Sequence, residues 1–579
     1  MREGVELFYP QRLAASDFET SECFDCEEAF GNGLFQSSFL MLSAVAILLT
    51  TCHADLVPIT ASQGVDHWCK RPDNSALSLK SWKKDTVPVN ADGRRSRCRV
   101  YGDPPESPRL FRTNRSEVAC REWDYESGDD GASVASAWDA VCQRRVLVLF
   151  GTMAMQQAGS LFFLLAGGLM LDAYGRDRVR LGAAVITTVC TVLGCTFIRY
   201  RALYAIAQCV LSGSAAVNAA ATLLVSFEVL IDRHKPKHVI FASTPSIALA
   251  ELWFLVVRNM RVGWEVKHAA FLSPTFLLVI TAAFMGRPES PRWLIAKGRI
   301  KEAEAVILGA ARMNGFVPGP GAANLLERIE NVRRCGNRDS SASSDSDPRR
   351  HSPIDASASI RRRLLVMFAV HFSLAFAVHV NIASQVARGD DRDTWWLPSV
   401  LVSAASVLGN AVVHAAVTCV SLDRVLVAAS VVAGGIHCVA SVFCNFETAA
   451  DRGLLAFSSG VANVAIVVGA CRLMEGVPTA VRGAFLCWSL AGGRVGALLG
   501  CLTPLLSQNA RGHASFALSA FFLMASSFLA VLSRPSSQRE VEREDNHETS
   551  FPRSASSLRG SRPPSCRPPY RDSVGSKTS

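Results

Sequence analysis

The chain has 579 residues, of which 49% are hydrophobic and 19% are charged, and its mean hydropathy is +0.21. The fraction of charged residues is low for a soluble protein. The net charge of +10 does not indicate nucleic-acid binding, because the basic side chains are concentrated in segments 287–363 and 534–579. Such segments are typical of the cytoplasmic flanks of membrane helices, so we expect a lipid bilayer as partner and no nucleic acid.

Twelve apolar runs divide the chain, each of about 20 residues, the length that crosses a hydrocarbon core of roughly 30 Å. Backbone polar groups in lipid must be satisfied within each segment, so these runs predict helices. The fold class predicted is therefore an all-α membrane protein with twelve transmembrane helices and both termini inside the cell. The runs are residues 34–54, 145–171, 179–198, 202–230, 238–257, 266–285, 364–385, 396–418, 425–444, 453–470, 481–506 and 514–533.

The first helix is followed by a polar loop, residues 55–144, that is far too long for a connection within a bundle. Residues 1–33 before it are predicted to be a cytoplasmic N-terminus, because they lack the layout of a signal peptide. Asn114 begins an Asn-Arg-Ser sequon, which predicts glycosylation if the loop is extracellular. An even set of cysteines facing an oxidising compartment predicts disulfides, with three possible connectivities for four cysteines. The cysteines are Cys69, Cys98, Cys120 and Cys142.

The end of the second helix reads Gly168-Leu-Met-Leu-Asp172-Ala-Tyr-Gly175-Arg176. Its glycines permit a tight turn between the second and third helices. Asp172 can accept hydrogen bonds from a helix N-terminus or from an arginine, so we expect an ion lock on the cytoplasmic face.

Acid–base pairs recur in the two halves of the chain at a fixed spacing. Glu228 lies seven residues before Lys235, and Glu475 lies seven residues before Arg482. The two pairs are 247 residues apart, which predicts a duplicated six-helix unit.

Residues 287–315, which follow the sixth run, predict a short amphipathic helix at the inner mouth of the bundle. Ser290 is a good helix N-cap, and Pro291 falls at the first helical position, where its missing N–H is not needed. Farther along, apolar residues at helical spacing form one face and charged residues are left for water. The apolar residues are Ala303, Val306, Ile307 and Ala310, and the charged ones are Lys301, Glu302, Glu304 and Arg312.

The string PESPRWL at residues 288–294 closely resembles the signature of the organic cation/anion transporter family, solute carrier family 22 of the major facilitator superfamily. Residues 31–36, 120–142 and 475–482 resemble the same family. The resemblance implies two six-helix halves that rock around a central cavity and expose it alternately to each side. The residues that it implies for gating are Gly168, Asp172, Gly175, Arg176, Glu228, Lys235, Glu289, Arg292, Glu475 and Arg482.

Ionisable residues inside membrane helices are costly and mark functional sites by default. Arg494 lies in the eleventh helix, and its Arg-Val-Gly string resembles that of organic-anion members of the family. Glu251 lies in the fifth helix, and a salt bridge between these two residues that holds the halves together is the structural alternative. His379, Asn381 and Phe376 on the seventh helix are further candidate substrate contacts, although hydrogen bonding between helices or packing is the commoner role of such side chains.

These observations predict a multi-pass plasma-membrane transporter of small organic ions, with organic anions as the favoured class. The alternatives are a carrier of organic cations or zwitterions, with Glu251 as the counter-charge, and a receptor or scaffold that has lost transport. Uniport and exchange for a counter-transported ion are both open, and we expect neither an enzyme nor a cofactor nor a metal site. The predicted segments are helix one at 34–54, helices two to six within 145–285, a cytoplasmic loop at 286–363, helices seven to twelve within 364–533 and a disordered cytoplasmic tail at 534–579.

Overall fold

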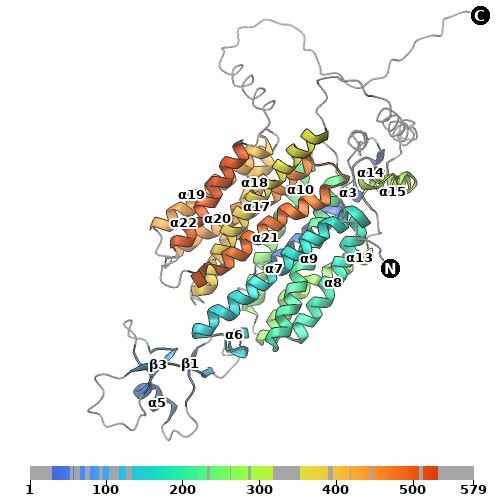
Figure 1. Cartoon of the computed structure of the whole chain (residues 1–579). Coiled ribbons are helices and arrows are strands. Elements are labelled where there is room, and N and C mark those ends of the chain that lie inside the picture. The colour runs from blue at the N-terminus through green and yellow to red at the C-terminus, as the bar shows by residue number, and fades with distance from the viewer. Residues whose placement is uncertain are drawn as a thin grey trace, which may run out of the picture. The chain divides into compact units, whose positions relative to one another are not determined.

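The structure is a computed structural model, and Figure 1 shows the whole chain. The helical bundle and the first loop both belong to the unit formed by residues 1–533. The described residues are 29–52, 56–57, 66–71, 78–89, 95–102, 116–125, 133–230, 235–260, 262–284, 289–316, 353–388, 396–417, 419–443, 448–506 and 513–532.

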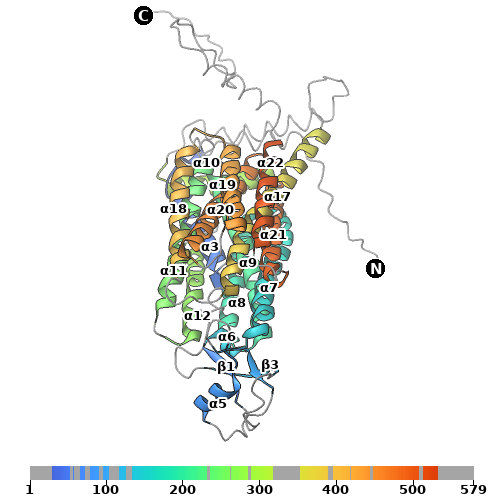
Figure 2. The ribbon, with the colours of Figure 1, turned by 90° about the vertical axis from the view of Figure 1, so that its left-hand side faces the viewer.

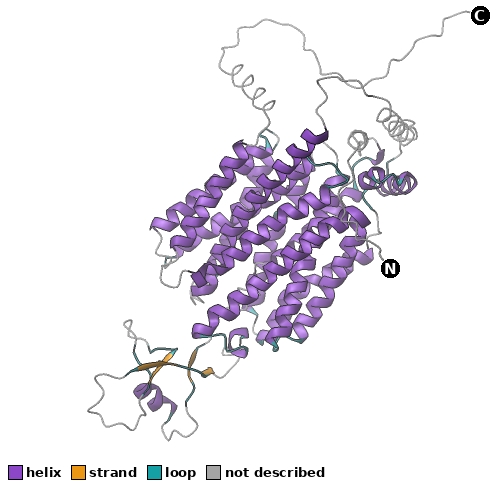
Figure 3. Ribbon diagram, in the orientation of Figure 1, coloured by secondary structure: helices purple, strands orange, loops and turns teal. Residues whose placement is uncertain are grey.

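The described residues are almost all helical, as the apolar runs predict (Figure 3). Eleven helices in this part of the chain are long and apolar enough to cross a membrane. The first half consists of α3 (Leu34–Thr51), α7 (Cys142–Tyr174), α8 (Arg176–Thr196), α9 (Arg201–Val229), α10 (Lys235–Ser243), α11 (Pro245–Asn259), α12 (Trp264–Leu272) and α13 (Phe276–Phe284). The second half consists of α17 (Pro353–Arg388), α18 (Leu397–Ala416), α19 (Leu422–Phe443), α20 (Ala449–Glu475), α21 (Arg482–Leu506) and α22 (His513–Leu532).

The sixth predicted run is present as a broken helix. Between α12 and α13 lies a short 3₁₀ helix, Ser273–Thr275, with Pro274 inside it. Proline has no N–H to donate and interrupts the hydrogen-bond ladder of an α-helix. The three pieces together cover residues 264–284, which is the predicted span of 266–285 with its helix divided in the middle.

The long first loop forms a small two-sheet element at one end of the bundle (Figure 2). Strand β1 (His67–Cys69) pairs antiparallel with β4 (Trp123–Tyr125), and β2 (Arg99–Tyr101) pairs antiparallel with β3 (Glu117–Ala119). Two short helices, α5 (Leu79–Thr86) and α6 (Val134–Ala137), complete it. The predicted disulfides are confirmed, with Cys69 bonded to Cys120 and Cys98 to Cys142. Asn114 lies outside the described residues.

The stretch that carries the family signature folds as two helices at the opposite end of the bundle, α14 (Pro291–Ala296) and α15 (Ile300–Met313). The Ser290 hydroxyl caps α14, and Pro291 is its first residue, as predicted. The break between the helices, which the sequence did not predict, contains Gly298 with a positive φ of 75°. The predicted apolar face of α15 belongs to one apolar cluster with residues of α14, α3 and α9, in which Val306 is partly buried and the rest of the face is buried, while its charged residues are exposed.

Helix α21 lies between α17 of its own half and α7 of the first half. Small residues bring these helices close together. A Cβ atom on Gly496 would lie 2.1 Å from the carbonyl oxygen of Phe372 on α17. A Cβ atom on Gly168 of α7 would lie 2.8 Å from the Cβ atom of Cys487 on α21. Helix α21 is therefore the element that places side chains at the junction of the two halves.

Candidate functional site

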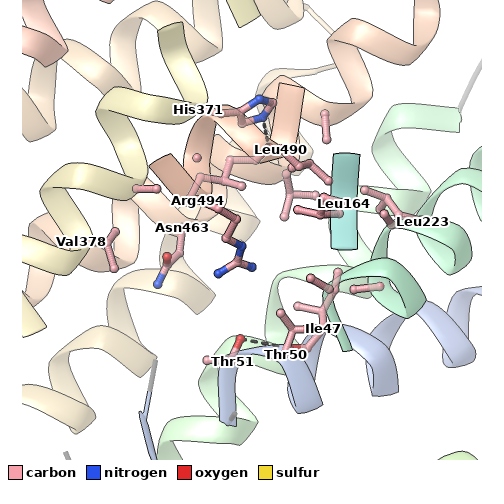
Figure 4. Close-up of a pocket in the computed structure, with 18 of the residues that line it drawn as sticks. Ile47, Thr50, Thr51, Leu164, Leu223, His371, Val378, Asn463, Leu490 and Arg494 are labelled. Atoms are coloured by element: carbon pink, nitrogen blue, oxygen red, sulfur yellow. Dashed lines mark hydrogen bonds between the residues drawn. The ribbon is translucent and has the colours of Figure 1, made fainter. Parts of the chain in front are cut away.

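A cavity of about 150 Å³ lies where α3, α9 and α11 of the first half face α17, α20 and α21 of the second. Figure 4 shows side chains from both halves converging on it. Much of its wall is apolar and comes from leucine, isoleucine, valine and alanine residues. Those drawn and labelled include Ile47, Leu164, Leu223, Val378 and Leu490.

The polar side chains that line the cavity are basic or neutral. Arg494 extends from α21 into the middle of the cavity, toward the residues of α3 (Figure 4). Among the described residues that line the cavity there is no aspartate or glutamate. The other polar lining residues are Thr50, Thr51, His371, His379 and Asn463.

Gln157 of α7 joins Arg494 to His379 across the two halves. Arg494 Nη1 donates to Gln157 Oε1 at 3.1 Å, and Gln157 Nε2 lies 3.1 Å from His379 Nε2. His379 Nδ1 lies 2.9 Å from the carbonyl oxygen of Ala375. A carbonyl oxygen only accepts, so His379 carries its proton on Nδ1 and receives the Gln157 amide proton on Nε2. The network is therefore complete when His379 is neutral.

His371 is a second histidine of the cavity wall, eight positions before His379 on α17. Its Nδ1 lies 2.7 Å from the Ser489 hydroxyl of α21 and its Nε2 lies 3.1 Å from the carbonyl oxygen of Ile466 on α20. The ring thus ties three helices of the second half together beside the cavity.

Three of the predicted substrate-binding residues do not line the cavity. Glu251 is buried on α11, one turn beyond the lining residue Ile247. Asn381 points into the interior of the second half, where its Nδ2 donates to Ser459 Oγ at 2.7 Å. Phe376 is buried against Phe522, with ring centroids 5.3 Å apart. Of the five predicted residues, the structure brings Arg494 and His379 together at the cavity.

At the end of the bundle that carries α14 and α15, Asp172 of α7 caps the N-terminus of α21. The backbone amides of Gly483 and Ala484 donate to its two carboxylate oxygens at 3.0 and 2.7 Å. Arg176 Nη1 lies 3.2 Å from the same carboxylate. The predicted partners of Asp172, a helix N-terminus and an arginine, are both present, and the first belongs to the other half.

Arg176 and Glu228 form the buried centre of this lock. Their side chains are both 0% exposed, and Arg176 Nη2 lies 3.1 Å from Glu228 Oε1. The second half contributes two more groups: the carbonyl oxygen of Thr479 accepts from Arg176 at 2.7 Å, and Arg482 Nη1 lies 3.5 Å from Glu228 Oε1. A buried charge is tolerated only when it is paired and hydrogen-bonded, and these contacts meet that requirement.

The signature residues before and within α14 complete the lock. Glu289 accepts from the backbone amide of Arg176 at 2.9 Å and from that of Asp177 at 3.1 Å, at the tight turn that begins α8. Burial raises the pKa of Glu289, although these backbone amides act in the opposite direction. Arg292 Nε donates to the backbone carbonyl of Glu228 at 3.0 Å.

The repeated pairs of the two halves are not equivalent in three dimensions. Arg482 contacts Glu228 of the first half, whereas Glu475 lies 3.6 Å from Arg472, one turn earlier on α20. Arg472 also pairs with Asp423 at the start of α19, at 2.7 Å. The side chain of Lys235 is outside the described residues.

Sequence reasoning missed Gln157 and His371, although both are polar residues in apolar helices and could have been noticed for that reason. Gln157 follows Gln156, whose Nε2 donates to Gln208 of α9 at 3.2 Å within the first half. Which glutamine contacts Arg494 depends on the rotation of α7, and one sequence does not determine it.

The fold and the cavity are those of a helical membrane protein whose two halves face each other across a central cavity. No protein-family model matches the chain. The proton:xylose symporter XylE superposes with a TM-score of 0.54 at 14% identity, covering 86% of this chain and 94% of that one. The partially occluded inward-open xylose transporter XylE from E. coli gives 0.52 at 12% identity, over 86% and 98%. At such low identity these structures establish the fold.

Sequence comparison adds curated relatives at low identity. Rat (Rattus norvegicus) solute carrier family 22 member 7 is 28% identical over 321 residues, which are 52% of this chain and 58% of the relative. Mouse (Mus musculus) organic cation/carnitine transporter 2 is 27% identical over 273 residues, 44% of this chain and 47% of the relative. The chain thus spans about half the length of the relatives that it matches. The predicted resemblance is confirmed: the chain is related to solute carrier family 22 and has the major facilitator fold.

Proposed function

We propose that the chain is a transporter of small organic anions that works by alternating access. The observation that carries this proposal is the cavity between the halves, which is lined by Arg494 and, among the described residues, by no acidic side chain. A guanidinium offers a planar fork of donors that matches a carboxylate or a sulfonate. A substrate with such a group would place its charge beside Arg494.

The size and polarity of the cavity support a substrate with one compact apolar group. An apolar cavity of about 150 Å³ is large enough for benzene, and the volume here is the same. The leucine, isoleucine and valine side chains of the wall would surround that group. An aromatic or branched aliphatic anion of this size therefore fits the proposal best.

The lock at the α14 end supports alternating access. Asp172, Arg176 and Glu228 bind groups of the second half, so the halves are joined at this end. When contacts between the halves close one end of the cavity, a substrate can enter only from the other end. Rocking of the halves would open the closed end and close the open one. The proposal therefore assigns Asp172 and Arg176 to the switch and Arg494 to the site.

The direct test is uptake by cells or proteoliposomes containing the full chain, with two permanently charged probes of similar size. Benzenesulfonate is the anion and phenyltrimethylammonium is the cation, and neither titrates near neutral pH. We expect saturable uptake of benzenesulfonate that exceeds uptake of the cation. Preferred uptake of phenyltrimethylammonium would favour the cation carrier, with Glu251 as counter-charge. Uptake of neither probe would favour a receptor or scaffold.

We also propose a plasma-membrane location in which the disulfide-bonded loop faces the exterior and the α14 end faces the cytoplasm. Its support is the pair of disulfides, which persist in oxidising compartments, and the basic residues that the sequence concentrates in 287–363, the segment that contains α14 and α15. Asn114 would then be glycosylated. A glycosidase should shift the mobility of the wild-type chain to that of Asn114→Gln, and equal mobility without the enzyme would contradict this orientation.

A further inference from the structure

The hydrogen bonds around Gln157 carry an inference that rests on the proposed function and deepens it. The amide has two different ends, an acceptor oxygen and a donor nitrogen. The oxygen accepts from Arg494 and the nitrogen points at His379, both at 3.1 Å. Arginine can only donate, so the oxygen end belongs to Arg494, and this leaves the nitrogen end for His379.

Protonation of His379 makes this arrangement impossible. The protonated ring would carry hydrogen on Nε2 as well as on Nδ1, and Nδ1 is already used by the Ala375 carbonyl. Nε2–H would face the N–H of the Gln157 amide, so two donors would meet. Rotating the amide by half a turn restores a hydrogen bond to His379, and such terminal torsions have broad, roughly two-fold preferences. The amide nitrogen then faces Arg494, which cannot accept it.

We propose that His379, Gln157 and Arg494 form a relay that couples the binding of a proton to the binding of the organic anion. A proton from the solution binds His379 Nε2, the Gln157 amide turns, and Arg494 Nη1 is released from the amide to the anionic group of the substrate. No covalent bond other than the N–H bond on Nε2 forms or breaks, and the proton and the anion leave the site together. By linkage, proton binding strengthens anion binding by the same factor by which the anion strengthens proton binding.

The groups around His379 determine the electrostatic environment of a proton bound there. From α21 the charged neighbour is Arg494, and from α7 the neighbour is the neutral Gln157. The walls from α3 and α20 contribute Thr50, Thr51 and Asn463, which do not titrate. On α11 the lining residue is Ile247, and Glu251 lies one turn behind it outside the lining.

His371 of α17 is the other titratable group of the wall. In the neutral ring Nε2 donates to the Ile466 carbonyl and Nδ1 accepts from the Ser489 hydroxyl, so on protonation only that hydroxyl has to turn to accept from Nδ1. A proton on His379 would sit beside the guanidinium of Arg494. The anion would reduce that repulsion, which is why the two should bind together.

The test measures protons taken up for each benzenesulfonate bound by the purified full chain, by calorimetry in buffers of different ionisation enthalpy. The sulfonate keeps its charge throughout, so any uptake belongs to the protein. We expect uptake approaching one proton for each anion over the pH range in which the proton and the anion bind together. In the same range, affinity should rise about tenfold for each unit by which pH falls.

His379→Gln should bind benzenesulfonate with no proton uptake and with affinity independent of pH. Gln157→Leu keeps His379 and Arg494 and removes the amide that links them, and it should reduce proton uptake to less than about half of the wild-type value. His513→Gln, outside the cavity at the start of α22, is the matched control and should behave like the wild type.

Undiminished proton uptake in His379→Gln or in Gln157→Leu would overturn the relay. Loss of proton uptake in His371→Gln, with His379 and Gln157 unchanged, would also overturn it. Anion binding by the wild type without proton uptake would overturn the relay and leave the proposed function standing. Absence of benzenesulfonate binding at every pH would overturn both.

Discussion

The two halves of the bundle carry charge clusters at the same end, and the clusters differ in what they join. In the first half, Asp172 caps α21 and Glu228 pairs with Arg482, so both reach into the second half. In the second half, Arg472 pairs with Asp423, and this bond joins α20 to α19 of the same half. Under the proposed alternating access, bonds between the halves would break as the bundle rocks, whereas bonds within one half would persist. A motif that is repeated in the sequence can therefore serve a switch in one copy and the stability of a half in the other.

The first cluster is also the more deeply buried. Arg176 and Glu228 have side chains that are 0% exposed, while those of Arg472 and Asp423 are 13% and 15% exposed. An ion pair without access to water depends on the groups around it, so breaking it costs more. The predictions below compare Asp172, a partner of the fully buried Arg176, with Asp423, the partner of Arg472.

Asp172→Asn should have the larger effect on transport. The change keeps the shape of the side chain and removes the charge that binds Arg176 and the N-terminus of α21. Removing one partner of a buried pair costs about 3–5 kcal/mol, so the state in which this end is closed should lose stability of that order. Maximal transport should fall, and the ranking of competing substrates should stay the same.

Thiol labelling gives a second readout of the Asp172→Asn variant. Cys487 of α21 is buried against Gly168 of α7, at the junction that opens when the lock opens. Cys471, buried on α20, is the internal control. Mass spectrometry should find more labelling of Cys487 relative to Cys471 than in the wild type. A reordered substrate ranking would instead place Asp172 in the substrate site.

Asp423→Asn should have the smaller effect on switching. It removes the partner of Arg472, at a cost of about 1.5–3 kcal/mol for hydrogen bonds to a charged group. Because both residues belong to the second half, the melting temperature should fall while the labelling of Cys487 stays at the wild-type level. A rise in Cys487 labelling equal to that of Asp172→Asn would remove the distinction between the two clusters.

The membrane fold could be predicted from the sequence because its signals are local. Each apolar run is long enough to span the bilayer, and the cap at Ser290 and the apolar face of α15 depend on neighbouring residues alone. The break in the sixth span at Pro274 and the turn at Gly298 were missed, although each contains a residue that commonly ends a helix. A proline or glycine permits a break without requiring one.

The candidate site could be predicted in part. Arg494 was found because a charge inside a membrane helix is rare. Gln157 was missed because its role depends on two partners, Arg494 and His379, that lie 337 and 222 positions away. The pairing of Arg482 with Glu228 was not predicted for the same reason, because it depends on the packing of α21 against the first half.

The central claim is that Arg494 gives the cavity its preference for anions. The structural alternative, a salt bridge with Glu251, predicts that either single change destabilises the chain and that Glu251→Gln combined with Arg494→Gln restores folding. Thermal melting of these three variants separates the two cases before any transport is measured.

The most direct measurement is benzenesulfonate uptake by Arg494→Ala, normalised to the amount of folded chain in the membrane. Loss of hydrogen bonds from a charged group costs about 1.5–3 kcal/mol, so uptake at low substrate concentration should fall at least about tenfold. Phenyltrimethylammonium uptake should not fall with it. Normal benzenesulfonate uptake by a well-folded Arg494→Ala chain would contradict the assignment of this cavity to organic anions.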